Sequence, residues 1–325
     1  MKPPVPPATA VKLEPSAVRR RTPPMNVTLT GATGLIGAGI VRALQVRGDA
    51  VTVLSRDPDR ARAALGDVDA YAWQPLDGPA PAAALSGRDA VVHLAGESVA
   101  QRWTDASRRA IHDSREIGTR HLVAGLAAAD PRPRVLVSAS GVNYYGPRGD
   151  EPVTEDAPPG DDYLAHVCIA WEREAQTARE LGLRVAMLRT AIVLDKHGGA
   201  LSKMLPFFRL GIGGPVAGGR QYLPWIHADD IVGLYLAALD DASWEGPINA
   251  CAPEPATNRD FSRALGRALR RPALAPVPGF AVRVLYGDMA QIVTTGQRTV
   301  PMRALEHGYA FRHTDLEQAL RDALG

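Results

Sequence analysis

Lysine is scarce in this sequence. It occurs four times in 325 residues, at Lys2, Lys12, Lys196 and Lys203, although lysine and arginine together number 37. Arginine therefore carries nearly all of the positive charge. Any mechanism that needs a lysine between residues 13 and 195 is excluded.

Other features are also sparse or absent. The two cysteines, Cys168 and Cys251, cannot form a disulfide framework, which favours a reducing cytoplasm. No apolar run approaches the roughly 18 residues of a membrane helix, and the first two dozen residues lack the apolar core of a signal peptide. The eight histidines show no close metal-ligand spacing, so we predict no metal site.

The overall charge points to no macromolecular partner. A net charge of +2 gives no reason to expect nucleic acid as a partner.

Residues 1–24 are rich in Pro, Ala and Arg and show no periodic pattern of apolar residues, so we expect a flexible extension that is dispensable for folding. The adjacent Arg19, Arg20 and Arg21 leave a basic docking arm as the alternative. The oligomeric state stays open between a monomer and a homodimer.

From Met25 onward, short Val/Leu-rich runs alternate with longer helical stretches. Such runs are typical of parallel strands that are covered on both faces. The predicted strands are 27–30, 51–54, 90–94, 135–138 and 185–188, and the predicted helices are 35–47, 58–65, 105–128, 161–181 and 229–240. This order predicts an α/β fold with a Rossmann-type doubly wound parallel sheet.

The chain divides into two predicted parts after the extension. Residues 25–190 form the nucleotide-binding domain, with later strands from about 222–251. Residues 191–221 and 252–325 form a smaller, mostly helical substrate lobe, in which 257–270, 280–291 and 314–324 are the expected C-terminal helices.

A glycine-rich motif stands between the first strand and the first helix. Gly31 permits a tight turn, Gly34 lets the backbone approach a pyrophosphate, and Gly37 lets helix and strand pack closely. The helix N-terminus then offers free N–H groups to the anion. The predicted cofactor contacts here are Gly31, Thr33, Gly34, Leu35, Ile36 and Gly37.

The end of the second strand selects the nucleotide. An NAD site places Asp or Glu there for the ribose 2′-hydroxyl, whereas an NADP site supplies an arginine for the 2′-phosphate. This sequence has Ser55 and Arg56, followed by Asp57 as a helix N-cap. NADP(H) is therefore favoured, and a solvated surface arginine is the alternative.

Further cofactor contacts are expected at later strand ends. His93-Leu94-Ala95-Gly96 closes a strand with small residues, against which ribose and nicotinamide can lie. We interpret His93 itself as a core histidine. The remaining predicted cofactor contacts are Leu94, Ala95, Gly96, Ser138 and Arg115, the last with a surface salt bridge as its alternative.

Together with Ser138-Ala139-Ser140, these motifs resemble the extended short-chain dehydrogenase/reductase superfamily. The sequence is most similar to one atypical branch, the epimerase family related to human SDR39U1 and bacterial YfcH, with its DUF1731-type C-terminal segment. The motifs that carry this similarity are Tyr144-Tyr145-Gly146, Gly160-Asp161-Asp162-Tyr163-Leu164, Trp171-Glu172, Trp225-Ile226-His227 and Gln297-Arg298-Thr299-Val300-Pro301. The resemblance covers nearly the whole chain from Met25 and implies the fold and the cofactor, but says little about the substrate.

The superfamily implies a catalytic Ser, a Tyr and a Lys four residues after that Tyr. Ser140 matches the serine, yet no lysine follows any tyrosine at this spacing. Alignment on Glu172 puts Cys168 at the lysine position. Tyr144 and Tyr145 are the remaining candidates for proton transfer, with packing roles as the alternative for either.

The glycine-rich stretch 198–219 encloses a short predicted helix, 201–210, where open α/β sheets place substrate-covering elements. The candidate substrate contacts are Lys203, Arg209, Trp225 and His227, with solvated charges as the alternative for the first two.

The sequence leaves two functions open. One is an NADP(H)-dependent oxidoreductase or epimerase-like enzyme that acts on a polar carbonyl or nucleotide-sugar-like substrate. The other is a catalytically weak NADP(H)-sensing protein that regulates a partner.

Overall fold

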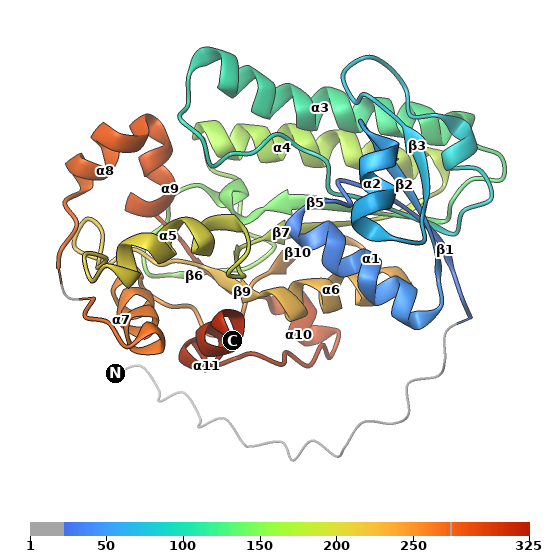
Figure 1. Ribbon diagram of the computed structural model, residues 1–325. Coiled ribbons are helices and arrows are strands. Elements are labelled where there is room, and N and C mark those ends of the chain that lie inside the picture. Colours follow the sequence, from blue (N-terminus) through green and yellow to red (C-terminus); the bar gives the residue numbers. More distant parts are fainter. Residues whose placement is uncertain (1–22, 274) are drawn as a thin grey trace, which may run out of the picture.

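A seven-stranded parallel sheet forms the centre of the computed structural model, which describes residues 23–273 and 275–325 (Figure 1). The predicted extension 1–24 lies almost wholly outside the described residues. The strand order is β3-β2-β1-β4-β5-β7-β10. These strands are β1 (Asn26–Thr30), β2 (Ala50–Ser55), β3 (Asp69–Ala72), β4 (Ala90–His93), β5 (Val135–Gly141), β7 (Arg184–Thr190) and β10 (Gly246–Ala250). The order reverses between β1 and β4, the topological switch point where doubly wound sheets bind ligands.

Helices cover both faces of the sheet (Figure 1). One face carries α1 (Leu35–Arg47) and α6 (Ala228–Asp240), and the other carries α3 (Asp105–Ala128) and α4 (Tyr163–Gln176), which η3 (Thr177–Leu181) extends. The α2 helix (Pro58–Leu65) packs on β2 and β3. Because both faces are covered, the central strands are almost continuously apolar and buried.

The predicted fold class is confirmed, and α1, α2 and α3 have the predicted bounds. The sequence did not reveal β3, because Ala70 is the one buried residue of this edge strand. The α6 helix begins one residue earlier than expected, since the His227 side chain accepts a hydrogen bond from Asp229 N at its N-terminus.

The later part of the chain builds a smaller lobe around a separate apolar core. Of the strands expected between about 222 and 251, β10 joins the central sheet, whereas β9 (Trp225–His227) pairs with β8 (Ile192–Leu194) in a two-stranded sheet. The short strand β11 (Arg298–Thr299) pairs with β6 (Pro152–Val153) and so ties the C-terminal segment to the first domain. The helices of this part are α5 (Gly199–Arg209), α7 (Asn258–Leu269), α8 (Gly279–Tyr286), α9 (Gln291–Thr294), α10 (Met302–Glu306) and α11 (Leu316–Leu324). Three short 3-10 helices complete the elements: η1 (Ala82–Ala84), η2 (Val142–Tyr145) and η4 (Gly287–Ala290).

The C-terminus of α7 carries backbone strain. Arg270 has φ 54° and ψ 43°, the left-handed conformation that glycine usually supplies at this position. A left-handed conformation costs a residue with a Cβ about 1–2 kcal/mol, and glycine avoids this steric cost. Part of the gain is offset, because glycine loses more conformational entropy on folding than other residues do.

We expect Arg270→Gly to raise the free energy of unfolding by about 0.5–1 kcal/mol in urea denaturation. The control Arg267→Gly, inside the helix, should lower it by about 1 kcal/mol. Destabilisation by both changes would contradict the strain argument.

Candidate active site

The glycine-rich motif forms a tight turn between β1 and α1. Gly31 has φ 67°, and a Cβ there would lie 2.8 Å from the carbonyl carbon of Leu94. A Cβ on Gly37 would lie 2.4 Å from the carbonyl oxygen of Gly31, so glycine keeps α1 close to the turn. Gly34 is the N-cap of α1, whose first turn contains no acidic residue. The free N–H groups of this turn can therefore bind an anion.

The start of α5 lies directly beside this turn. A Cβ on Gly198 would be 3.2 Å from the Leu35 side chain. Leu35 and Ile36 are half-buried in the first turn of α1, and Thr33 is exposed. The predicted substrate-covering segment thus begins next to the predicted phosphate cradle.

A chain of buried hydrogen bonds fixes the end of β4. Thr30 Oγ1 accepts hydrogen bonds from the two backbone N–H groups that follow His93, and it lies 2.7 Å from His93 Nδ1. His93 Nε2 is 2.9 Å from Thr119 Oγ1. Burial and then the charge of Arg115 lower the pKa of His93 to about 3, so the imidazole is neutral at pH 7. His93 is a core histidine, as the sequence indicated, and it orients the strand end.

The end of β2 presents an arginine. Ser55 Oγ bonds to both the backbone N–H and the carbonyl of Asp57, and Asp57 caps α2 through a 3.0 Å bond from Arg60 N, as predicted. Arg56 is exposed, and among the described residues no carboxylate pairs with it. Its guanidinium is therefore available to a ligand at the strand end.

Ser140 belongs to a buried ionic network. Its hydroxyl donates a 2.7 Å hydrogen bond to Glu172 Oε1, and Glu172 also accepts two bonds of 2.8 Å from Arg189. Ser140 and Arg189 are register partners on β5 and β7. Arg189 was not among the site residues predicted from the sequence. An arginine inside an apolar strand was the available signal, because arginine is rarely buried unless it is paired.

The two tyrosines have different surroundings. Tyr145 is fully buried, accepts a 2.8 Å hydrogen bond from Arg189 and donates one of 2.6 Å to Asn249. Burial raises the pKa of Tyr145 despite the opposing charge of Arg189. Tyr144 is half-buried, and the centre of its ring lies 3.5 Å from the Arg189 guanidinium carbon. Within the described chain the Tyr144 hydroxyl has no hydrogen-bond partner, so Tyr144 is the better placed of the two for proton transfer.

Arg115 brings a second cation to the end of β4. It donates hydrogen bonds to the carbonyls of Glu97 and Ile111 at 2.9 and 3.1 Å, and its guanidinium carbon lies 4.9 Å from the centre of the Trp171 ring. A Cβ on Gly96 would be 3.1 Å from the same carbon. No carboxylate of the described residues forms an ion pair with Arg115. This half-buried cation therefore lacks an ion-pair partner and can meet a ligand anion.

Cys168, at the position aligned with the superfamily lysine, supplies no charge. It is buried, and desolvation followed by the charge of Glu172 raises its pKa to about 12. At neutral pH it is an uncharged thiol, which supports a packing role rather than that of a nucleophile.

Two residues predicted to contact a ligand are buried in the protein interior. Ser138 is fully buried, and its hydroxyl donates to the carbonyl of Ala139 at 3.1 Å. Trp225 is 1% exposed and packs inside the lobe core. Neither side chain reaches an accessible surface in this structure, and the contacts of Ser138 with the cofactor and of Trp225 with the substrate remain predictions.

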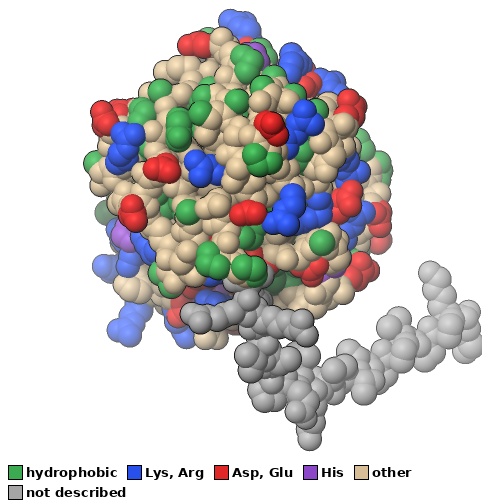
Figure 2. Space-filling view, turned by 90° about the vertical axis from the view of Figure 1, so that its right-hand side faces the viewer, with side chains coloured by type: hydrophobic (Ala, Val, Ile, Leu, Met, Phe, Trp, Pro, Cys, Tyr) green, Lys and Arg blue, Asp and Glu red, His purple; other side chains and the backbone are tan. Residues whose placement is uncertain are grey.

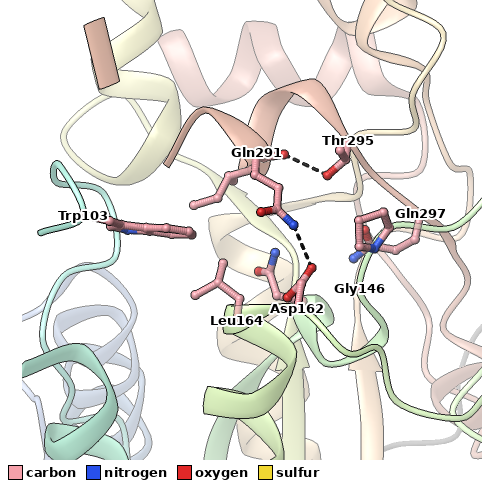
Figure 3. A pocket seen from close by; sticks show the side chains of 10 residues that line it. Trp103, Gly146, Asp162, Leu164, Gln291, Thr295 and Gln297 are labelled. Carbon is pink, nitrogen blue, oxygen red and sulfur yellow. Dashed lines mark hydrogen bonds between the residues drawn. The ribbon is translucent and has the colours of Figure 1, made fainter. Parts of the chain in front are cut away.

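A narrow pocket opens between the two parts of the chain (Figure 3), and Asn143, the residue before Tyr144, is in its wall. Its lining residues are Trp103, Asn143, Gly146, Pro147, Asp162, Leu164, Gln291, Ile292, Thr295 and Gln297. Gln291 donates a 3.0 Å hydrogen bond to Asp162, and so α9 contacts the start of α4 (Figure 3). The volume of about 20 Å³ is close to what one water molecule needs, so substrate entry requires these walls to separate.

The other three substrate candidates are dispersed, and none of them lines this pocket. Lys203 donates a hydrogen bond to the carbonyl of Ala100, which joins α5 to the loop before α3. Arg209 is exposed at the end of α5. His227 caps α6 and stacks on His313 with ring centres 3.6 Å apart.

Possible metal-ligating atoms lie close together at the stacked rings of His227 and His313. Atoms of His227, Asp229 and His313 lie within 4.8 Å of one another, although the sequence spacing gave no sign of this. The ring planes differ by only 25°, so their in-plane lone pairs do not converge, and His227 Nδ1 already accepts a hydrogen bond from Asp229 N. We therefore assign no metal to this cluster.

The parallel sheet, its switch point and the glycine turn define a Rossmann-type dinucleotide-binding protein. Comparison with known families identifies it further. Residues 27–251 match the NAD dependent epimerase/dehydratase family, and residues 277–323 match a domain of unknown function, DUF1731. The chain belongs to this epimerase/dehydratase family and has the fold of the short-chain dehydrogenases/reductases.

Individual relatives agree with this assignment. The chain is 39% identical to the chloroplastic SDR39U1 homolog of Arabidopsis thaliana, over 91% of this chain and 86% of the relative. It is 35% identical to the human epimerase family protein SDR39U1, over 92% and 99%. A crystal structure of the human protein with NADPH superposes with a TM-score of 0.82 at 33% identity, covering 93% of this chain and 100% of that chain. The described part of the chain contains no helix long and apolar enough to cross a bilayer.

Proposed function

We propose that this protein binds NADP(H) at the β1–α1 turn and reduces a polar carbonyl substrate. The observation that carries the choice of nucleotide is the end of β2, where Arg56 is exposed and Ser55 stands in place of a carboxylate. The NADPH in the human SDR39U1 structure supports this choice. When bound, NADPH supplies the hydride.

Arg56 should discriminate between the two nucleotides. A charge-assisted bond to a 2′-phosphate is worth about 1.5–3 kcal/mol. We expect Arg56→Ala to weaken NADPH binding roughly ten- to a hundredfold and to leave NADH binding almost unchanged, as measured by calorimetry. Arg60→Ala, in the first turn of α2, is the matched control and should change neither affinity by more than about twofold. Equal affinity of the unaltered protein for the two nucleotides would rule out the assignment.

The surrounding side chains suggest which residue donates the proton to the carbonyl oxygen. Ser140 is buried and donates its hydrogen to Glu172, so it cannot also donate a hydrogen bond to a substrate carbonyl. We assign proton donation to Tyr144, and we place Arg115 against a phosphate or another anionic group of the bound molecules. Glu172 and Arg189 hold Ser140 and the tyrosine pair in position.

A second function is favoured by the uncharged Cys168 and the narrow pocket. Without a lysine beside the tyrosine and with little room for a substrate, the protein could retain NADP(H) as a ligand that regulates a partner. NADPH oxidation measured against a panel of aldehydes, ketones and keto sugars separates the two functions. Turnover that Tyr144→Phe abolishes supports the reductase. Tight NADPH binding without turnover of any carbonyl supports the regulatory role.

A further inference from the structure

A groove on the C-terminal lobe is lined by arginine. Arg263, Gly266 and Arg267 on α7, together with the following residues 270–273, enclose an open volume of about 430 Å³. Two of those following residues are Arg270 and Arg271, so four arginines meet in one concave site. The α7 helix lies next to α11 at the lower left of Figure 1, and none of these residues lines the narrow pocket between Asn143 and Gln291.

The backbone is shaped to bring these side chains together. Positions 263 and 267 are four residues apart, so their side chains stand on one face of α7, and Arg270 follows as the C-cap of the helix. The chain then turns back across the helix, because Arg271 N bonds to the carbonyl of Gly266 at 2.9 Å. A Cβ on Gly266 would lie 2.6 Å from the Ala273 side chain, so glycine is needed for this return. The left-handed Arg270 completes the turn at a cost in backbone strain.

Little negative charge balances the groove. Glu317 on α11 accepts a 2.6 Å bond from Arg267, but it is shared with Arg321. In the described chain, the side chains of Arg263, Arg270 and Arg271 have neither hydrogen bonds nor ion pairs. Like charges at this spacing repel each other. By contrast, basic and acidic side chains are interspersed over the face shown in Figure 2, as the net charge of +2 would suggest.

We propose that this groove binds a small molecule that carries two or more phosphate groups. Guanidinium groups bind phosphate oxygens through paired hydrogen bonds, and a concave volume of this size suits a small ligand. Pro272 and Ala273 also line the groove. A compact site of this kind fits a diphosphate better than a nucleic-acid strand, which needs an extended basic track.

Pyrophosphate is a suitable probe for the groove. Calorimetric titration is carried out on the full chain with excess NADPH, so that the cofactor turn is occupied. We expect saturable binding that the double variant Arg263→Gln/Arg271→Gln weakens at least tenfold. Arg270→Gly, which removes a charge while relieving the backbone, should also weaken binding and should not lower the melting temperature. The matched control Arg42→Gln/Arg132→Gln, which removes two arginines elsewhere, should stay within twofold of the unaltered protein.

The same measurements can overturn the proposal. It fails if the unaltered protein does not bind pyrophosphate, or if the groove and control variants bind it equally well. It also fails if a single-stranded RNA of 20 nucleotides binds more tightly than pyrophosphate and loses that binding in Arg263→Gln/Arg271→Gln. The groove would then be a nucleic-acid surface.

Discussion

Replacing Arg189 by methionine should lower the free energy of unfolding by about 3–5 kcal/mol. Arg189 and Glu172 have side chains that are 3% and 5% exposed, and Arg189 also donates to Tyr145 and to the carbonyl of Glu155. Its removal leaves the Glu172 carboxylate charged and unpaired in a low-dielectric interior, and the desolvation cost of that charge dominates the loss. Urea denaturation of the folded protein measures the change.

A surface ion pair provides the matched control. Arg173 is 61% exposed and pairs with Glu116, so Arg173→Met should cost less than about 1 kcal/mol. The double variant Arg189→Met/Glu172→Met should lose less than the sum of its two single variants, because no charge is then left unpaired. If Arg189→Met and Arg173→Met cost the same, the buried network does not stabilise the fold as described.

Tyr144→Phe should lower the rate of NADPH-driven carbonyl reduction by roughly a hundred- to ten-thousandfold. The expected loss rests on the proposed role of Tyr144 as proton donor. With no lysine to stabilise a phenolate, the tyrosine donates a proton more readily than it abstracts one. Single-turnover kinetics at saturating NADPH measure the rate.

Tyr145→Phe separates chemistry from folding. Its hydroxyl is buried between Arg189 and Asn249, so its loss should cost about 1–3 kcal/mol of stability. The folded fraction should keep most of its reductase activity, whereas Tyr144→Phe should keep its melting temperature and its NADPH affinity. A reductase activity that survives Tyr144→Phe would exclude this tyrosine as the proton donor.

The features that the sequence determined depend on local rules. The apolar runs define five of the seven central strands, Gly31 and Gly37 define the turn, and Asp57 defines the start of α2. Each of these signals lies within a few neighbouring residues, where steric limits on φ and ψ or hydrogen bonding to the nearby backbone select one conformation. The missing lysine is likewise evident from the sequence alone, because the absence of a residue type can be seen without knowing where the side chains lie.

The tertiary structure decided which side chains share one environment. Tyr145 and Asn249 are 104 residues apart, yet a single hydrogen bond joins them beside Arg189. The sequence could not distinguish Tyr144 from Tyr145, because adjacent tyrosines have the same local pattern and differ only in what packs around them. The same holds for the arginine groove, where the stripe on α7 can be read from spacing but the return of the chain at Gly266 closes the site. Such placements follow from strand order and packing between distant segments, which no local rule encodes.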